Sequence, residues 1–135
     1  MKTIVLIACA AKKVSHRARA AELYVSPLFT ANLRYARSLR PDAIYILSAK
    51  HGLLALDQEV EPYDLTLNTM PVAQVRAWAG HVVAQLRGQA DLQNDRFILL
   101  AGSKYRKFIV PHLAHWEAPL EGMRIGEQLQ WLGRQ

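Results

Sequence analysis

The run Thr3-Ile-Val-Leu-Ile-Ala-Cys9 decides the fold class. Apolar and β-branched residues follow one another in it without alternation, a pattern typical of strands that are buried on both faces of a parallel sheet. Two further runs have the same character, Ala43-Ile-Tyr-Ile-Leu-Ser48 and Arg96-Phe-Ile-Leu-Leu-Ala101. We therefore expect three mainly parallel, neighbouring strands in the middle of the protein.

A helical pattern follows each predicted strand. Ser26 and Pro27 have the cap-then-proline form of a helix start, and the pattern continues over 28–39. A second helix is expected over 71–87, with Gly88 as its C-terminal stop. These two helices are long enough to connect the parallel strands as crossovers.

Shorter elements are expected in the C-terminal third of the chain. Ser103 is placed to cap a helix over 104–115, which Pro111 should kink or split because proline has no N–H to donate. A last helix is expected over 125–132, and a short edge strand near Trp116.

Alternating strands and helices predict an α/β fold. We expect a single domain over 1–135, built as a three-layer sandwich with right-handed crossovers and a short, mainly parallel, Rossmann-like sheet. The stretch 49–70 shows no clear pattern, and a connection of that length usually has a function.

Composition excludes several classes of protein. With 51% hydrophobic residues the chain can form a packed core, yet no apolar stretch reaches the roughly 18–20 residues that cross a membrane. The single cysteine, Cys9, can form neither an internal disulfide nor a multi-cysteine zinc site, so we expect a cytoplasmic protein without a membrane partner or cofactor. The 17 Lys and Arg against 11 Asp and Glu give a net charge of +6, which favours an anionic partner such as nucleic acid or a nucleotide.

Polar residues collect after each predicted strand, at the end where parallel sheets bind ligands. They are Cys9, Lys12 and Lys13 after the first strand, Ser48, Lys50, His51 and Gly52 after the second, and Gly102, Ser103, Lys104 and Tyr105 after the third. Small residues among them allow backbone N–H groups to approach a ligand, and Ser103 is expected at a helix N-terminus, which favours anions. The spacing matches neither a Walker A loop nor a dinucleotide-binding turn, so it indicates phosphate or carboxylate without naming the ligand.

Each of these groups also has a purely structural interpretation. Lys12 and Lys13 are equally compatible with charges in a solvated loop, and Cys9 with a small buried residue. The pair Gly102-Ser103 is compatible with an ordinary turn from strand to helix. Two titratable residues and a glycine directly after a buried strand, by contrast, favour a cleft at 48–52.

The long loop contains the pair Tyr63 and Asp64. The tyrosine offers a ring on which a base can stack, and the aspartate can act as a general base or stabilise a cationic transition state. Asp64 is equally compatible with a carboxylate that accepts loop N–H groups. A third interpretation, in which Asp57, Glu59, Glu61 and Asp64 bind Mg²⁺ or Ca²⁺, lacks the calcium-loop pattern, and we expect no metal.

Six motifs together resemble a small bacterial and phage family of uncharacterised domains. They are Ala8-Cys9-Ala-Ala-Lys12-Lys13, Tyr24-x-Ser26-Pro27-Leu28-Phe29, Leu47-Ser48-Ala-Lys50-His51-Gly52-Leu53-Leu54, Glu61-Pro62-Tyr63-Asp64-Leu65-Thr66-Leu67, Gly102-x-x-Tyr105 and Pro119-Leu120-Glu121-Gly122-x-x-Ile125-Gly126-x-Gln128-Leu129. A weaker resemblance, over 48–69, is to the YaaA family of peroxide-stress proteins that bind DNA. This second resemblance implies a link to nucleic acids and to base damage or base modification.

Two functions are consistent with these features. The first is an enzyme that hydrolyses or exchanges the base at an N-glycosidic bond of a nucleoside or nucleic acid. Asp64, His51 and Lys50 are its expected catalytic residues, with His51 protonating the leaving base, while Tyr63 stacks the base and the strand-end residues bind the substrate. The alternative is a non-catalytic DNA-binding stress or repair protein, in which Arg34 and Arg37 contact phosphates. A nucleotide sensor without turnover is a third, related function.

Overall fold

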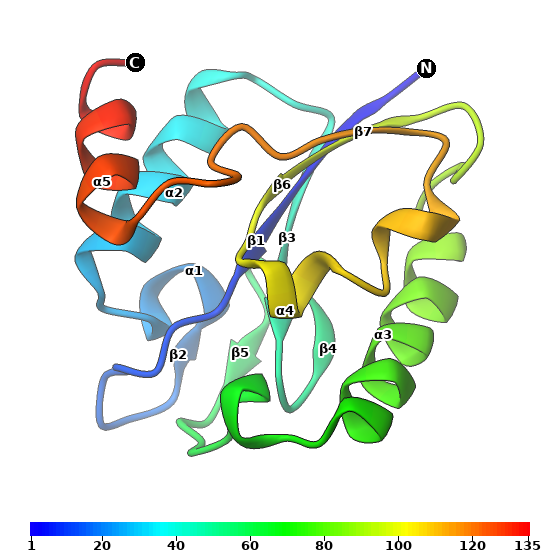
Figure 1. The fold of residues 1–135 in the computed structure, drawn as a ribbon. Coiled ribbons are helices and arrows are strands. Elements are labelled where there is room, and N and C mark those ends of the chain that lie inside the picture. The colour runs from blue at the N-terminus through cyan, green and yellow to red at the C-terminus, as the bar shows by residue number, and fades with distance from the viewer.

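The computed structural model describes residues 1–135 and has a five-stranded sheet at its centre, with the strand order β4-β3-β1-β6-β7 (Figure 1). The strands are β1 (Thr3–Ala8), β3 (Ala43–Ser48), β4 (Gly52–Ala55), β6 (Arg96–Leu100) and β7 (His115–Glu117). All pairs are parallel except β3 with β4. The predicted α/β sandwich with a mainly parallel sheet is confirmed.

The central strand β1 explains why its sequence does not alternate. Val5, Leu6 and Ile7 are each 0% exposed, because helices cover both faces of the sheet. Successive side chains of β1 enter two separate cores: Ile4 and Leu6 pack on one face, and Val5 and Ile7 pack on the other. A strand buried on both faces has no position at which a polar side chain reaches water.

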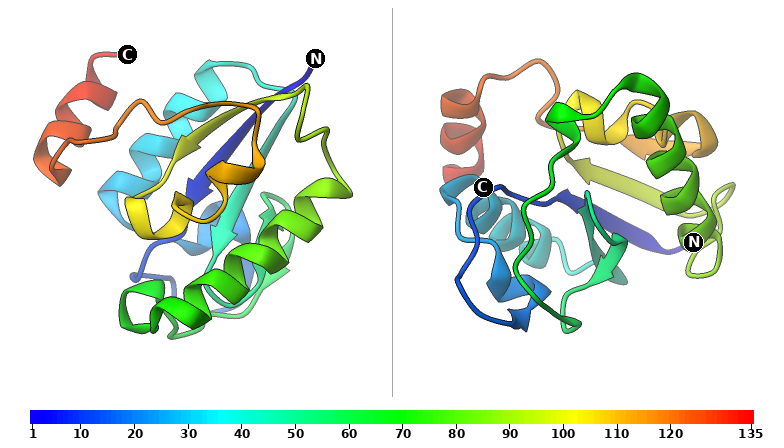
Figure 2. Two further views of the ribbon diagram at one scale, coloured as in Figure 1. Left: turned by 45° about the vertical axis from the view of Figure 1, so that its right-hand side comes forward. Right: turned by 90° about the horizontal axis from the view of Figure 1, so that it is seen from below.

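Three long helices form the outer layers. Helix α3 (Val72–Arg87) covers one face, while α2 (Pro27–Ser38) and α5 (Ile125–Gly133) cover the other, as the two views in Figure 2 show. The side chain of Ser26 caps α2 by accepting a hydrogen bond from the N–H of Phe29 at 3.0 Å. The predicted helix positions are thus confirmed for all three, and none of the helices has the length and apolar character needed to cross a membrane.

The predicted helix over 104–115 is split, as Pro111 leads us to expect, but its expected cap by Ser103 is wrong. The predicted helix is replaced by the single turn α4 (Ser103–Arg106) and the 3-10 helix η2 (Val110–His112). The N-terminal cap of α4 is Gly102, whose carbonyl accepts the N–H groups of Tyr105 and Arg106, so Ser103 is the first helical residue and makes no capping bond. The expected edge strand near Trp116 is confirmed as β7.

The stretch 49–70 is more regular than its sequence suggests. It contains β4, the short strand β5 (Glu59–Val60) and the 3-10 helix η1 (Leu67–Thr69). Strand β5 pairs with β2 (Ala18–Arg19), which precedes the short helix α1 (Ala20–Leu23). Elements of two to four residues are too short to produce a periodic pattern in the sequence.

Candidate functional site

The chain leaves β1 and β6 in opposite directions, although these strands lie side by side. After β1 it continues to α2 on one face of the sheet, and after β6 it continues to α4, whose Tyr105 packs with α3 on the other face (Figure 1). Such a switch point leaves a crevice between the carboxyl ends of the two strands, where open α/β sheets bind ligands.

A cavity of about 730 Å³ lies at this switch point. Its volume falls within the range of about 300–1,000 Å³ that is usual for small-molecule sites. One part of its wall is the polar turn after β6, with Gly102, Ser103 and Lys104. The opposite part comes from α2 and α5 and is mainly apolar, with Leu28 and Leu129. A ligand that fills this cavity therefore meets polar groups at one end and apolar side chains at the other.

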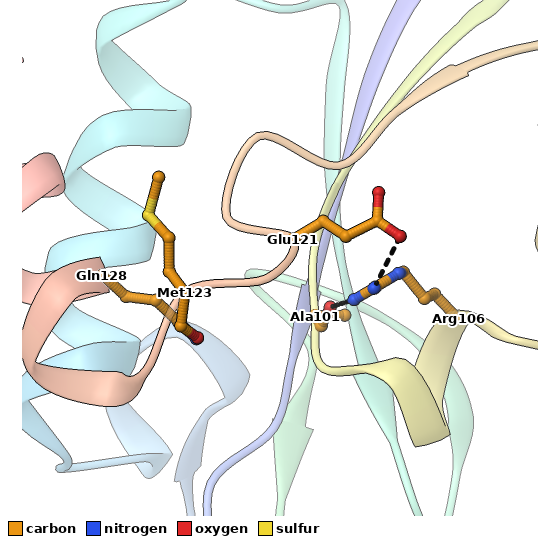
Figure 3. A network of polar contacts seen from close by, with 5 residues as sticks. All are labelled: Ala101, Arg106, Glu121, Met123 and Gln128. Atoms are coloured by element: carbon orange, nitrogen blue, oxygen red, sulfur yellow. Dashed lines mark hydrogen bonds and ion pairs between the residues drawn. The ribbon is translucent and has the colours of Figure 1, made fainter.

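A network around Arg106 closes the wall between α4 and α5 (Figure 3). Its guanidinium donates to the carbonyl of Ala101 at 2.8 Å and pairs with the carboxylate of Glu121 at 3.3 Å. In the same segment, the side-chain amide of Gln128 donates to the carbonyl of Met123 at 3.0 Å. The Arg106 side chain is only 13% exposed, so these contacts hold the segment before α5 against the end of β6.

Most of the cavity residues were missed by the sequence reasoning, among them the polar residues Asn32, Arg106, Glu121 and Gln128. Asn32 carries the clearest signal, because it occupies a core position of α2 between Phe29 and Ala36 at helical spacing and is 4% exposed. A polar residue at a core position of an amphipathic helix is a deviation that sequence alone can detect. Arg106 lies in the wall because α4 directly follows β6, whereas Glu121 and Gln128 reach it because α5 packs beside α2.

A chain of hydroxyl groups lies beside the cavity, at the end of β3. The hydroxyl of Tyr63 is 2.6 Å from that of Tyr24 and 2.7 Å from Oγ of Ser48, and Ser48 also accepts the N–H of His51 at 3.1 Å. Burial raises the pKa of Tyr24 to about 12 and moves the pKa of Tyr63 in the same direction. These phenols therefore remain neutral and act as hydrogen-bonding groups.

The ring of Tyr63 already has neighbours. The ammonium of Lys13 lies 4.3 Å from the ring centroid and also donates to the carbonyl of Ala11 at 3.0 Å. The imidazole of His51 meets the same ring edge-on, with centroids 5.5 Å apart. A base that stacks on Tyr63, as the sequence reasoning expects, must share this ring with Lys13.

Cys9 lies at the cavity wall and packs against the hydrophobic cores on both faces of the sheet. Its thiol lies 3.4 Å from the hydroxyl of Tyr105, and both residues line the cavity. Burial, followed by the nearby Cys9, raises the pKa of the Tyr105 hydroxyl above its usual value. Trp78 packs edge-on against Tyr105 and donates its indole N–H to the carbonyl of Ser48 at 2.8 Å.

The predicted site residues fall into two groups. Cys9 and the run 102–105 line the cavity, whereas Lys13, Ser48, His51 and Tyr63 form the adjacent hydroxyl cluster. Together with Tyr24, these four residues make up the hydroxyl cluster: Lys13, Tyr24, Ser48, His51 and Tyr63. Lys12, Lys50 and Asp64 are exposed and belong to neither group.

Two details of the predicted site change with the structure. Burial, reinforced by Lys50, lowers the pKa of His51 and so favours its neutral form, in which the ring can accept a proton as a general base. The single turn of α4, four residues long, is too short for the helix N-terminus that was expected to attract an anion at Ser103.

Gly52, expected to bind the ligand, lies in a hairpin outside the cavity wall. Residues 49–51 form the turn between β3 and β4, and Gly52 follows it with a φ of +73°, a conformation that favours glycine. A Cβ at this position would lie 2.3 Å from Oε1 of Gln85. Gly52 therefore faces α3 and closes a hairpin, and its role is structural.

The acidic residues of the long loop do not assemble. Asp57, Glu59, Glu61 and Asp64 are exposed, and Glu61 makes a 3.6 Å ion pair with Arg17. No group of three or more His, Cys, Asp or Glu side chains is arranged to hold a metal ion.

Comparison with known proteins places the chain in a family. It is 32% identical over 145 residues to an uncharacterized protein of Bacillus subtilis (strain 168), YfjM, and the alignment covers 99% of this chain and 95% of that protein. No solved structure shows significant similarity. Residues 4–134 match the model of a family of unknown function, DUF6884. The resemblance to a small family of uncharacterised bacterial domains is thereby confirmed, and the chain belongs to the DUF6884 family.

Proposed function

We propose that this protein binds a nucleotide, free or within a nucleic acid, in the cavity between β1 and β6 and cleaves its N-glycosidic bond there. The observation that carries the proposal is the place of the cavity, at the switch point of the parallel sheet, where both a polar and an apolar wall are available. The free thiol of Cys9 and the need for nucleotides fit a cytoplasmic protein.

The polar wall suits the phosphate. Lys104 supplies a positive charge at the rim, where its ammonium donates to the carbonyl of Asn68 at 3.2 Å. Gly102 has no side chain and has open space around the position of a Cβ, so a phosphate can approach the backbone there. Sugar and base then extend toward α2 and α5, whose apolar side chains favour their less polar surfaces.

The proposed reaction needs a carboxylate beside the sugar. Cleavage of a glycosidic bond develops positive charge on the sugar, which a carboxylate stabilises or which a carboxylate-activated water attacks. Glu121 lines the cavity, and Asp64 lies exposed in the loop that carries Tyr63. The proposal therefore has two candidate carboxylates, and the neutral His51 is a candidate base.

The test is release of free base, measured by chromatography after incubation with nucleosides, nucleoside monophosphates and damaged-base oligonucleotides. Asp64→Ala and Glu121→Gln serve as controls for each other. The carboxylate that acts in the transition state should cost about 10²–10⁴-fold in rate when it is removed, while the other variant stays near the wild type. Absence of base release from every substrate would refute the proposed enzymatic activity, and wild-type rates in both variants would remove both carboxylates from the mechanism.

The second candidate is a non-catalytic DNA-binding stress or repair protein, as the resemblance to the YaaA family implies. Arg34 and Arg37 support it, because both are exposed on α2 and neither forms an ion pair within the protein. Neutralising both should weaken DNA binding and reduce its salt dependence, whereas Asp64→Ala should not. DNA affinity that does not change with salt would refute this candidate.

A further inference from the structure

Asn32 is a buried amide on the apolar face of α2. It is 4% exposed, and Oδ1 has no hydrogen-bond partner in the folded protein. It is the one buried side-chain polar atom of the chain in that condition. The neighbouring positions on this face are apolar, with Phe29 one turn before and Leu33 and Ala36 after it.

An amide in such a position lowers stability. A buried polar group without a partner costs the free energy of removing it from water, whereas an apolar side chain of the same size is neutral or stabilising there. Proteins depart from core patterning in this way mainly at functional sites. The place of Asn32 therefore points to a partner that is not part of the chain.

The cavity supplies the space for that partner. Asn32 lines it together with Leu28, Phe29 and Leu129, so a ligand at this end meets apolar surface and the amide of Asn32. The other amide of this wall, Gln128, already donates to the carbonyl of Met123. An amide presents a hydrogen-bond donor and an acceptor side by side. The edge of a nucleobase has the matching pair, and Asn is a common partner of such an edge.

The opposite end of the cavity carries a different chemistry. Ser103 and Lys104 lie beyond the end of β6, on the side of the sheet away from α2. A nucleotide that directs its phosphate to Lys104 has its base at the α2 end, where Asn32 lies.

We infer that the amide of Asn32 recognises the base of a nucleotide bound in this cavity, through an edge on which a donor and an acceptor stand side by side. The inference rests on the proposed function and adds a specificity-determining residue to it.

The test uses the full chain and its variant Asn32→Leu, which has nearly the same size but no polar atoms. Binding of AMP, GMP, CMP and UMP is measured by isothermal titration calorimetry, with ribose 5-phosphate as the ligand that lacks a base. The wild type should bind at least one nucleoside monophosphate more tightly than ribose 5-phosphate. Loss of two hydrogen bonds should weaken the binding of that nucleotide to Asn32→Leu by about 5- to 100-fold. The affinity for ribose 5-phosphate should not change.

Thermal unfolding of the same variant gives a second readout. Asn32→Leu should raise Tm by about 2–8 °C, because the variant removes an unsatisfied polar group from the core. The matched control is Asn94→Leu, the same replacement at an exposed site outside the cavity, where the amide donates to Asp91 at 2.7 Å. It should not raise Tm and should bind nucleotides as the wild type does.

The outcomes separate the inference from the proposed function. Nucleotide binding that Asn32→Leu leaves unchanged overturns the role of Asn32 but keeps the nucleotide site. Failure of the wild type to bind any of the nucleotides overturns the proposed function and this inference with it. A Tm that falls in Asn32→Leu shows that the amide stabilises the fold, and it overturns the argument from the buried unpaired group.

Discussion

Replacement of Gly52 by alanine tests the assignment of this glycine to the fold rather than to the ligand site. The left-handed conformation, with φ at +73°, costs a residue with a Cβ about 1–2 kcal/mol. The new Cβ would lie 2.3 Å from Oε1 of Gln85, which accepts the N–H of Leu53 at 2.8 Å. Gln85 must move away, and the half-buried N–H of Leu53 then loses its acceptor, at a cost of about 1–3 kcal/mol. The expected total for Gly52→Ala is about 2–5 kcal/mol of unfolding free energy.

Urea unfolding followed by tryptophan fluorescence measures this loss, because the buried Trp78 reports on the packing of α3. A double-mutant cycle with Gln85→Ala separates the two causes. In the Gln85→Ala background the nearest clash is gone and only Cδ2 of His81, at 3.0 Å, remains close. Gly52→Ala should then cost mainly the conformational part, about 1–2 kcal/mol. A Gly52→Ala variant within about 0.5 kcal/mol of the wild type, but with weaker ligand binding, would refute the structural assignment and restore Gly52 to the binding site.

Three further perturbations address the hydroxyl cluster and the cavity wall. Tyr63→Phe should lower the unfolding free energy by about 1–3 kcal/mol, since Ser48 and Tyr24 both lose a hydrogen-bond partner; denaturant unfolding checks this, and an unchanged midpoint would contradict it. Burial raises the pKa of Tyr24 from 10.0 to about 12 in the folded protein. The contribution of its neutral hydroxyl to the unfolding free energy is therefore complete below pH 10. It is lost as pH rises toward 12, at up to about 1.4 kcal/mol per pH unit. Stability measured against pH should therefore fall less steeply in Tyr24→Phe than in the wild type. Arg106→Met should destabilise by about 1–3 kcal/mol because the carbonyl of Ala101 loses its donor, whereas Glu121→Gln should cost no more than about 1 kcal/mol, since its carboxylate is 61% exposed; equal losses in thermal unfolding would contradict this assignment.

The elements that the sequence predicts well are those whose burial extends over several turns or over a whole strand. The run 43–48 coincides with β3, and helix α2 begins at Pro27 with Ser26 as its cap, as predicted, because long apolar runs and a Ser-Pro start are local signals. The hairpin β3–β4 was not predictable in the same way. Lys, His and Gly after a buried strand fit a loop that faces a cleft as well as they fit a tight turn, and only the pairing of Ser48 with Gly52 decides between them.

In the candidate site, too, local sequence signals predict some residues, while long-range packing positions the others. Cys9 and Gly102 reach the cavity because parallel strands end at one edge of the sheet, which the strand pattern alone predicts. Arg106 directly follows the strand-end run 102–105, whereas Glu121 lies in a later segment, so no local motif contains both residues. They meet only because the segment before α5 returns across the end of β6, a long-range arrangement that no local pattern encodes.

The end of β1 is where the separate parts of this site become mechanically connected. Cys9 packs against both cores, lines the cavity and contacts the hydroxyl of Tyr105, which packs in turn against Trp78. Trp78 holds the carbonyl of Ser48, and the side chain of Ser48 holds Tyr63 in the hydroxyl cluster. A continuous line of contacts therefore joins the cavity wall at Tyr105 to Tyr63 through Trp78 and Ser48. Tyr63 thus touches the same packed core as the cavity, although Asp64, its neighbour in the chain, lies outside the cavity wall.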